Sequence, residues 1–256
     1  MRSKRGKRSA SSKSTSTPAK IPKTTVSENK NETTETKLAV KSTDSRLMKE
    51  YYKKSCVDLA RDLLGKILVR KTEDGERLAG KIVETEAYLG GEDKGAHSYG
   101  GKKTEKNAAM FMDPGTCYVY YVYGLYSCVN ISSQGEGAAV LIRALDPVNG
   151  LAAMHISRSQ KRKKESKPFK DHELCNGPSK LCQAMRIDKK NFNCKDLTTI
   201  DEMWVEKGVD VDASEIIECP RIGIDYAKEW ATKPLRFYIK GNKNVSVKNK
   251  EVEKGN

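Results

Sequence analysis

The chain has 256 residues and a formal net charge of +14, a length that allows one large domain or two small ones. It has no run of about 18 apolar residues and no apolar signal-peptide core at its N-terminus, so we expect neither a membrane-spanning helix nor a membrane partner. Its seven cysteines include no Cys-x-x-Cys pair, which indicates reduced thiols in a reducing compartment.

The N-terminal segment differs in composition from the rest of the chain. Residues 1–50 contain 13 lysines and arginines against 5 acidic residues, a difference of +8, and no aromatic residue. Such a segment buries too little apolar surface to offset its ordering entropy, so residues 1–49 are predicted to form a disordered basic tail. Its run KRGKR (4–8) is either a nuclear address, a nucleic-acid contact or a solvated charge run.

Secondary structure is predicted from residue 50 to residue 247, with a second disordered tail over 248–256. The expected elements, in chain order, are a helix (55–64), two strands (66–71, 78–89), a long polar loop (90–107), two hairpin strands (116–123, 126–133), a strand ended by Pro147 (138–147), a helix (149–160), an exposed basic loop (161–170), a helix (177–187) and two strands (221–227, 235–241). Helix starts are marked by Ser55 as an N-cap and by Pro178 in a first turn, and Gly65 marks a helix end. This order predicts one α+β domain around a mostly antiparallel sheet.

Five of the 11 tyrosines lie in one nine-residue segment of the expected hairpin, residues 118–126. Tyr120 and Tyr121 face opposite sides of their strand, so the rings cannot all share one core. Ordinary sheet packing is sufficient to explain Tyr118 and Tyr121. Tyr123 precedes a glycine at the bend, and an exposed aromatic ring at a hairpin tip of a basic protein favours contact with stacked nucleic-acid bases.

Two acids and an arginine form the main catalytic candidates. Period-two alternation places Glu84, Glu86 and Tyr88 on one face of their strand, which is either a solvent-facing edge or a functional surface. Arg143 is a cation within the apolar strand VLIRAL and requires a carboxylate partner, which Glu84 or Glu86 would supply. Such a pair is either purely structural, or it keeps a glutamate ionised so that it can act as a general base toward water.

A metal site is not expected. His172, Cys175 and Cys182 are near one another in sequence, but their spacing matches no usual paired-ligand pattern and a fourth ligand is not evident. We therefore predict no metal and no cofactor.

Five long segments, in order and with compatible spacing, resemble the alkyladenine DNA glycosylases, the eukaryotic type of 3-methyladenine DNA glycosylase. These segments are VETEAYLGGEDKGAHS (83–98), NAAMFMDPGTCYVYYVYGLYSCVNISS (107–133), VLIRALDP (140–147), GPSKLCQAM (177–185) and KPLRFYIKG (233–241). The resemblance implies a single mixed α+β domain over 50–247, with a curved antiparallel sheet, surrounding helices and a protruding β-hairpin.

The resemblance also implies roles for the candidate residues. Glu86 matches the general base that deprotonates water, and Arg143 matches the arginine that holds this water. Tyr88 and Tyr120 match the rings that sandwich the extruded base, and His97 lines the same pocket.

Further roles implied by the resemblance concern the hairpin. Tyr123 matches the residue that intercalates from the minor groove in place of the flipped nucleotide, with Leu125 and Tyr126 beside it. Asn130 matches the pocket residue that disfavours guanine by crowding its 2-amino group.

The expected function is that of a monofunctional, nuclear, monomeric DNA glycosylase without lyase activity. It would flip and hydrolytically excise alkylated or deaminated purines from double-stranded DNA in base excision repair, with 3-methyladenine, 7-methylguanine, hypoxanthine and ethenoadenine as substrates. Two alternatives of other classes remain open at this point: a non-catalytic protein that bends DNA or senses damage, and an RNA-binding domain of similar sheet architecture.

Overall fold

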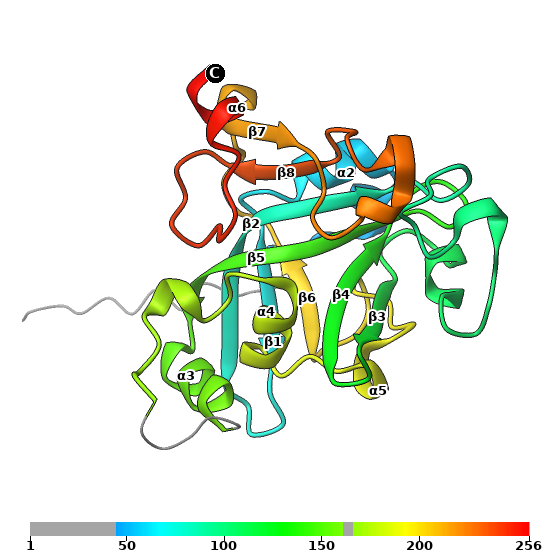
Figure 1. Ribbon diagram of the computed structural model, residues 1–256. Coiled ribbons are helices and arrows are strands. Elements are labelled where there is room, and N and C mark those ends of the chain that lie inside the picture. Colours follow the sequence, from blue (N-terminus) through cyan, green and yellow to red (C-terminus); the bar gives the residue numbers. More distant parts are fainter. Residues whose placement is uncertain (1–44, 161–165, 256) are drawn as a thin grey trace, which may run out of the picture. The chain divides into compact units, whose positions relative to one another are not determined.

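The computed structural model describes residues 45–160 and 166–255, which form one domain built on an eight-stranded antiparallel sheet (Figure 1). The strands are β1 (Ile67–Lys71), β2 (Arg77–Tyr88), β3 (Cys117–Val122), β4 (Tyr126–Ser132), β5 (Ala139–Asn149), β6 (Met203–Glu206), β7 (Ile216–Cys219) and β8 (Arg236–Ile239). Their order is β3-β4-β5-β2-β1-β6, with β8 pairing to β2 and β7 pairing to β8. The predicted α+β fold with an antiparallel sheet is confirmed.

Short helices surround the sheet. The α-helices are α1 (Lys49–Tyr52), α2 (Cys56–Asp62), α3 (Leu151–Ser159), α4 (Pro178–Ala184), α5 (Lys189–Phe192) and α6 (Lys250–Gly255), and 3-10 turns lie at Tyr99–Gly101, Ala108–Phe111, Asp171–Glu173, Ala213–Glu215 and Asp225–Trp230. Helix α2 packs on β2 and β5, α4 packs on β4 and β5, and α3 packs on α4. None of the helices within the described ranges is both long and apolar enough to cross a bilayer.

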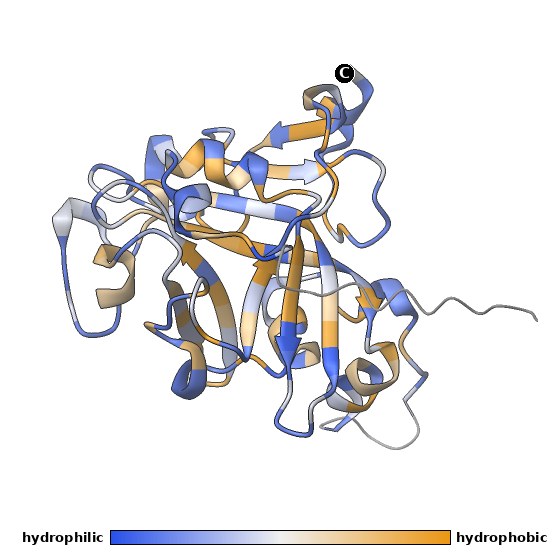
Figure 2. Cartoon of the chain, turned by 180° about the vertical axis from the view of Figure 1, so that it is seen from behind, coloured by the Kyte–Doolittle hydropathy of each residue, from blue (hydrophilic) through white to orange (hydrophobic). Residues whose placement is uncertain are grey.

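Strand β2 is the centre of the domain because it pairs with three other strands. Its first half (Arg77–Lys81) pairs with β1, its second half (Glu84–Glu86) pairs with β8, and its other edge pairs with β5. Apolar residues are frequent along the strands, while hydrophilic residues are frequent in the loops (Figure 2). The main core includes the fully buried Leu59 and Ile82.

The predicted caps and turns are confirmed. The Ser55 side chain accepts a hydrogen bond from the Asp58 N–H at the start of α2, and Gly65 follows that helix with a φ of 83°. Strands β3 and β4 form a hairpin whose bend has positive φ at Tyr123 (53°) and Gly124 (67°). Two successive positive φ values are typical of a type I′ turn, which matches the twist of hairpin strands.

Two strand predictions are wrong, and two further strands were not predicted. Strand β5 does not end at Pro147 but continues to Asn149, because a register shift opposite Ala79 and Gly80 accommodates a residue that lacks an N–H group. The segment 221–227 is not a strand but a loop that enters a 3-10 turn. Strands β6 and β7 were not predicted, since each has only four residues with weak alternation.

In the described residues, parts of both predicted tails are ordered, so each tail is shorter than predicted. Residues 45–49 lie against the domain: Leu47 is buried and donates its backbone N–H to the carbonyl of Val205. At the other end, α6 occupies most of 248–256, because Val252 packs against the small core cluster around β7 and β8. Residues 1–44 with the KRGKR run, and residues 161–165 of the basic loop, lie outside the described residues.

Candidate active site

Glu84 and Glu86 are completely buried, so their strand face is not a solvent-exposed edge. Their side chains have exposures of 1% and 0%. Arg143 lies between them, with Nε 3.2 Å from Glu84 Oε1 and Nη1 3.2 Å from Glu86 Oε1. The predicted pairing of this arginine is therefore confirmed, with both acids as partners.

A β-bulge directs Arg143 toward the two acids. Glu84 pairs with Ala144 and the next residue, Thr85, pairs with Ile142, so Arg143 is the extra residue of β5. Bulges of this kind re-aim a side chain and are frequent beside active sites. Burial alone would lower the pKa of Arg143, but the charges of Glu86 and Glu84 outweigh it and raise this pKa, so the guanidinium remains charged.

Each oxygen of Glu86 has a donor. Oε1 accepts a hydrogen bond of 2.9 Å from the backbone N–H of Ile222, and Oε2 accepts one of 2.8 Å from the hydroxyl of Tyr88. Burial, followed by the charge of Glu86, raises the pKa of Tyr88 well above its usual range, so its hydroxyl keeps the proton that it donates. The backbone N–H of Ile222 is available to Glu86 because residues 221–227 form a loop. In a regular strand, this N–H would bond to a neighbouring strand instead.

Arg236 is a second buried cation of this network that sequence reasoning missed. Its Nη1 is 2.8 Å from Glu84 Oε1, and it also donates to the carbonyls of Pro220 and Val247. Glu84 is thus shared by Arg236 and Arg143, and the network balances two anions with two cations. The signal was present in the sequence, because Arg236 stands in the apolar strand LRFYI as Arg143 stands in VLIRAL.

A cavity of about 280 Å³ lies directly above this charge network. Three groups that contact Glu86, namely Tyr88, Arg143 and Ile222, line the cavity, whereas the carboxylate itself is buried behind them. Other lining residues come from the loop 90–107, the turn Ala108–Phe111, the hairpin, β5, the start of α4 and the segment after β7: Gly95, His97, Met110, Tyr118, Tyr120, Val122, Cys128, Asn130, Leu141, Pro178, Ser179, Gly223, Ile224 and Tyr226. The volume and the planar walls suit one nucleobase.

The aromatic wall of this cavity is held by contacts between rings. Tyr118 and Tyr120 are stacked with centroids 5.4 Å apart, and His97 meets the Tyr120 ring edge-on at 4.6 Å. His97 Nδ1 is 2.8 Å from the Tyr118 hydroxyl. Burial lowers the pKa of His97, so the imidazole is neutral at pH 7. Tyr118 is buried and has the packing role expected for it.

Asn130 is positioned by the hairpin and lines the same cavity. Its Nδ2 donates a hydrogen bond of 3.1 Å to the backbone carbonyl of Tyr118, across the β3–β4 pairing. The side chain is buried and fixed, so it presents a defined edge to an occupant of the cavity.

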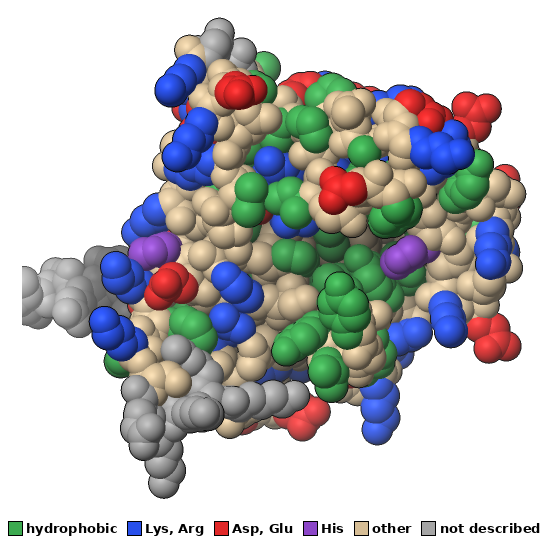
Figure 3. All heavy atoms as spheres, in the orientation of Figure 1, with side chains coloured by type: hydrophobic (Ala, Val, Ile, Leu, Met, Phe, Trp, Pro, Cys, Tyr) green, Lys and Arg blue, Asp and Glu red, His purple; other side chains and the backbone are tan. Residues whose placement is uncertain are grey.

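The tip of the hairpin is exposed and apolar. Tyr123 is 89% exposed, and Tyr121, Leu125 and Tyr126 are also exposed. In the space-filling view, hydrophobic side chains gather over the β3–β4 hairpin and the surface is hollowed beside it (Figure 3). An exposed aromatic ring at a hairpin tip is a shape that can insert between stacked bases.

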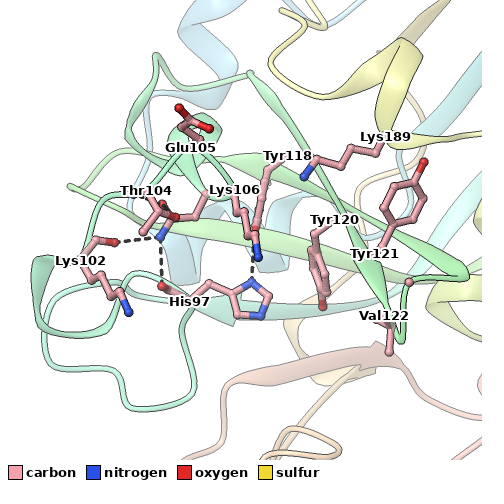
Figure 4. A pocket seen from close by; sticks show the side chains of 12 residues that line it. His97, Lys102, Thr104, Glu105, Lys106, Tyr118, Tyr120, Tyr121, Val122 and Lys189 are labelled. Carbon is pink, nitrogen blue, oxygen red and sulfur yellow. Dashed lines mark hydrogen bonds between the residues drawn. The ribbon is translucent and has the colours of Figure 1, made fainter.

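A second, larger hollow of about 990 Å³ adjoins the cavity and shares His97, Tyr118 and Tyr120 with it. Figure 4 shows His97 beside Tyr120, with Lys102 and Lys189 at opposite ends of this hollow. Lys106 also lines it. A groove that combines aromatic rings with ammonium groups suits a nucleic-acid strand.

An ion pair between Arg221 and Asp93 lies against Tyr88 and was also missed from the sequence. The Arg221 guanidinium is 4.6 Å from the centroid of the Tyr88 ring, and both its side chain and that of Asp93 are completely buried. The pair connects the loop 90–107 with the loop after β7.

The cysteines add no paired chemistry to this site. All seven are free thiols, as the sequence predicts. Cys175 and Cys182 are buried in the main core, and burial raises the pKa of Cys175 to about 12, so it remains a neutral thiol.

Comparison with known proteins identifies consistent relatives. A family model described as methylpurine-DNA glycosylase matches residues 50–243. The chain is 50% identical over 211 residues to a DNA-3-methyladenine glycosylase of Homo sapiens, and the aligned region covers 82% of this chain and 70% of that protein. It is 49% identical over 191 residues to a probable DNA-3-methyladenine glycosylase of Encephalitozoon cuniculi (75% of this chain, 88% of that protein). It is 46% identical over 204 residues to a putative 3-methyladenine DNA glycosylase of Clostridium botulinum (79% and 99%).

Proposed function

Since the chain belongs to the methylpurine-DNA glycosylase family and is thereby a DNA glycosylase, we propose that it flips damaged purines out of the duplex and hydrolyses their glycosidic bond. The substrates are 3-methyladenine, 7-methylguanine, hypoxanthine and ethenoadenine, and the pathway is base excision repair. The protein acts as a monomer in the nucleus. It needs no cofactor, and it has no lyase activity because the mechanism uses no covalent lysine.

Glu86 is the general base of the proposed reaction. The carboxylate accepts hydrogen bonds from Ile222 and Tyr88 and faces the guanidinium of Arg143. In the proposed complex, a water molecule binds at the floor of the cavity, beside the Arg143–Glu86 pair, and Glu86 takes its proton as the oxygen attacks the sugar. The sugar develops positive charge as the base departs, and the negative charge of Glu86 stabilises it.

The aromatic cavity is the proposed base pocket. Tyr88 and Tyr120 both line it and stack on the two faces of the extruded purine, with neutral His97 at its edge. A purine alkylated at N3 or N7 is cationic and already a good leaving group, and electron-rich rings stabilise it by about 0.5–2 kcal/mol. Asn130 crowds the 2-amino group of guanine and so disfavours the normal base.

The hairpin tip is the proposed wedge. Tyr123 enters the minor groove and fills the space that the flipped nucleotide leaves, with Leu125 and Tyr126 against the neighbouring bases. Extrusion costs a few kcal/mol and is least costly for a damaged or mispaired base. The wedge therefore contributes to selectivity before the pocket is reached.

The observation that carries this proposal is the position of Glu86: it is buried behind the floor of a base-sized aromatic cavity, in contact with Arg143 and Tyr88. The test is incubation with a duplex that contains hypoxanthine. Release of free hypoxanthine, with the strand left intact, is expected. Tight binding without release would instead indicate a damage sensor, and equal affinity for duplex RNA and DNA would indicate an RNA-binding domain.

A further inference from the structure

Arg221 lies behind one wall of the base pocket. Its Cζ is 4.6 Å from the centroid of the Tyr88 ring. Tyr88 lines the cavity, whereas the fully buried side chain of Arg221 does not. The guanidinium therefore contacts the ring from the side away from the cavity.

Several hydrogen bonds hold this cation in place. Arg221 Nη1 donates to the carbonyl of Ala87 at 2.9 Å, and both terminal nitrogens bind the Asp93 carboxylate at 2.7 Å. Asp93 in turn accepts the backbone N–H groups of Leu89 and Gly95. A side chain at Gly95 would collide with Arg221, since an added Cβ would lie 2.9 Å from Nη2. The cation is thus a fixed part of the pocket wall.

A cation on one face of an aromatic ring alters what the opposite face prefers. The electron-rich face attracts positive charge, and Arg221 already occupies one face of Tyr88. A second cation on the cavity side would be repelled by the first through the ring. A neutral base does not experience this repulsion and still gains the stacking contact.

We propose that Arg221 is a specificity-determining residue, which weakens the preference of the pocket for cationic alkylated purines and thereby admits neutral purines such as hypoxanthine. This inference rests on the proposed function, because it takes Tyr88 as a wall that stacks on the extruded base. Asp93 balances the charge of Arg221, so the effect is largest at the ring that the guanidinium touches.

The test compares two substitutions at this one position. Arg221→Gln removes the charge and can keep a hydrogen bond to Asp93, whereas Arg221→Lys keeps the charge and is the matched control. The measured quantity is kcat/KM for 7-methylguanine divided by kcat/KM for hypoxanthine, in otherwise identical duplexes. Arg221→Gln should raise this ratio by about threefold to tenfold, and Arg221→Lys should leave it within about twofold of the wild-type value.

Two further measurements keep the result decisive. Arg221→Gln with Asp93→Asn removes the unpaired carboxylate and should raise the same ratio, so an unchanged ratio in both folded variants would overturn the inference. If neither variant folds, inhibition of the wild-type protein by a free neutral purine and by its N-methylated cation decides the question. A preference of about threefold or less for the cation is expected, and about tenfold or more would refute the role of Arg221. A wild-type protein that releases neither base would refute the proposed function instead.

Discussion

Replacement of Arg236 by methionine should damage both stability and catalysis. Arg236 does not line the cavity, but its Nη1 neutralises Glu84 at 2.8 Å and its other bonds reach Pro220 and Val247. Methionine retains much of the apolar stem and removes the charge. Arg143 alone would then have to balance two buried carboxylates.

The expected loss follows from burial of the network. Removal of one partner from a buried ion pair costs about 3–5 kcal/mol, because an uncompensated charge remains. Each kcal/mol shifts the midpoint of thermal unfolding by about 2–4 °C in a domain of this size, so Arg236→Met should lower it by roughly 6–20 °C. Because Arg143 would be drawn toward Glu84, its contact with Glu86 should loosen, and single-turnover excision should slow by about tenfold or more, equivalent to about 1.4 kcal/mol in the barrier.

The assay is a double-mutant cycle with Glu84→Gln, followed by thermal unfolding and by hypoxanthine release. In the Glu84→Gln background, the carboxylate that Arg236 compensates is absent, so Arg236→Met should cost at least about 1 kcal/mol less than it does in the wild-type protein. Equal costs in the two backgrounds, or a loss below about 1 kcal/mol in the wild type, would refute the assignment of a coupled charge network.

The remaining predictions concern the pocket, the wedge and the N-terminal segment. Glu86→Gln should slow base release by at least about 10²-fold while binding to lesion-containing duplex persists, and near-normal turnover would remove Glu86 from the mechanism. Tyr123→Ser should reduce the fluorescence change of an ethenoadenine reporter, and an unaltered signal would mean that the tip does not intercalate. Because burial lowers the pKa of His97, this side chain becomes cationic only at a pH below the usual range of histidine. Under such acidic conditions, excision of cationic 7-methylguanine should fall relative to hypoxanthine, whereas His97→Gln should show a flatter ratio. Deletion of residues 1–44 should leave single-turnover excision within about twofold, and a larger loss would place a functional contact in that segment.

Sequence patterns predicted much of the fold because the relevant signals are local. The helix at Ser55 and the hairpin at Tyr123 depend on capping and turn preferences within a few residues. The two short strands β6 and β7 pair with β1 and β8, which lie elsewhere in the chain, and no short window of the sequence reveals this pairing.

The site shows the same division between local and distant causes. Alternation along β2 placed Glu84 and Glu86 on one face, and the charge in an apolar strand required a partner for Arg143. The bulge that aims this arginine was not predictable, because it depends on the register between β2 and β5. Arg236 carries the same signal as Arg143, a charge in an apolar strand, although its carboxylate partner is 152 residues away. Arg221 stands in a loop without such a signal, and its partner Asp93 is 128 residues away.

Strand β3 sets the distance between Tyr120 and Tyr123, the two residues proposed to contact a damaged nucleotide and its site in the duplex. Tyr120 lies on this strand and Tyr123 begins the turn that follows, three residues later, so the strand rise of about 3.3 Å per residue sets a separation of roughly 10 Å. Insertion of a single residue between them would turn one ring to the opposite face of the sheet. A change in the length of the hairpin would therefore displace one of the two proposed contacts relative to the other.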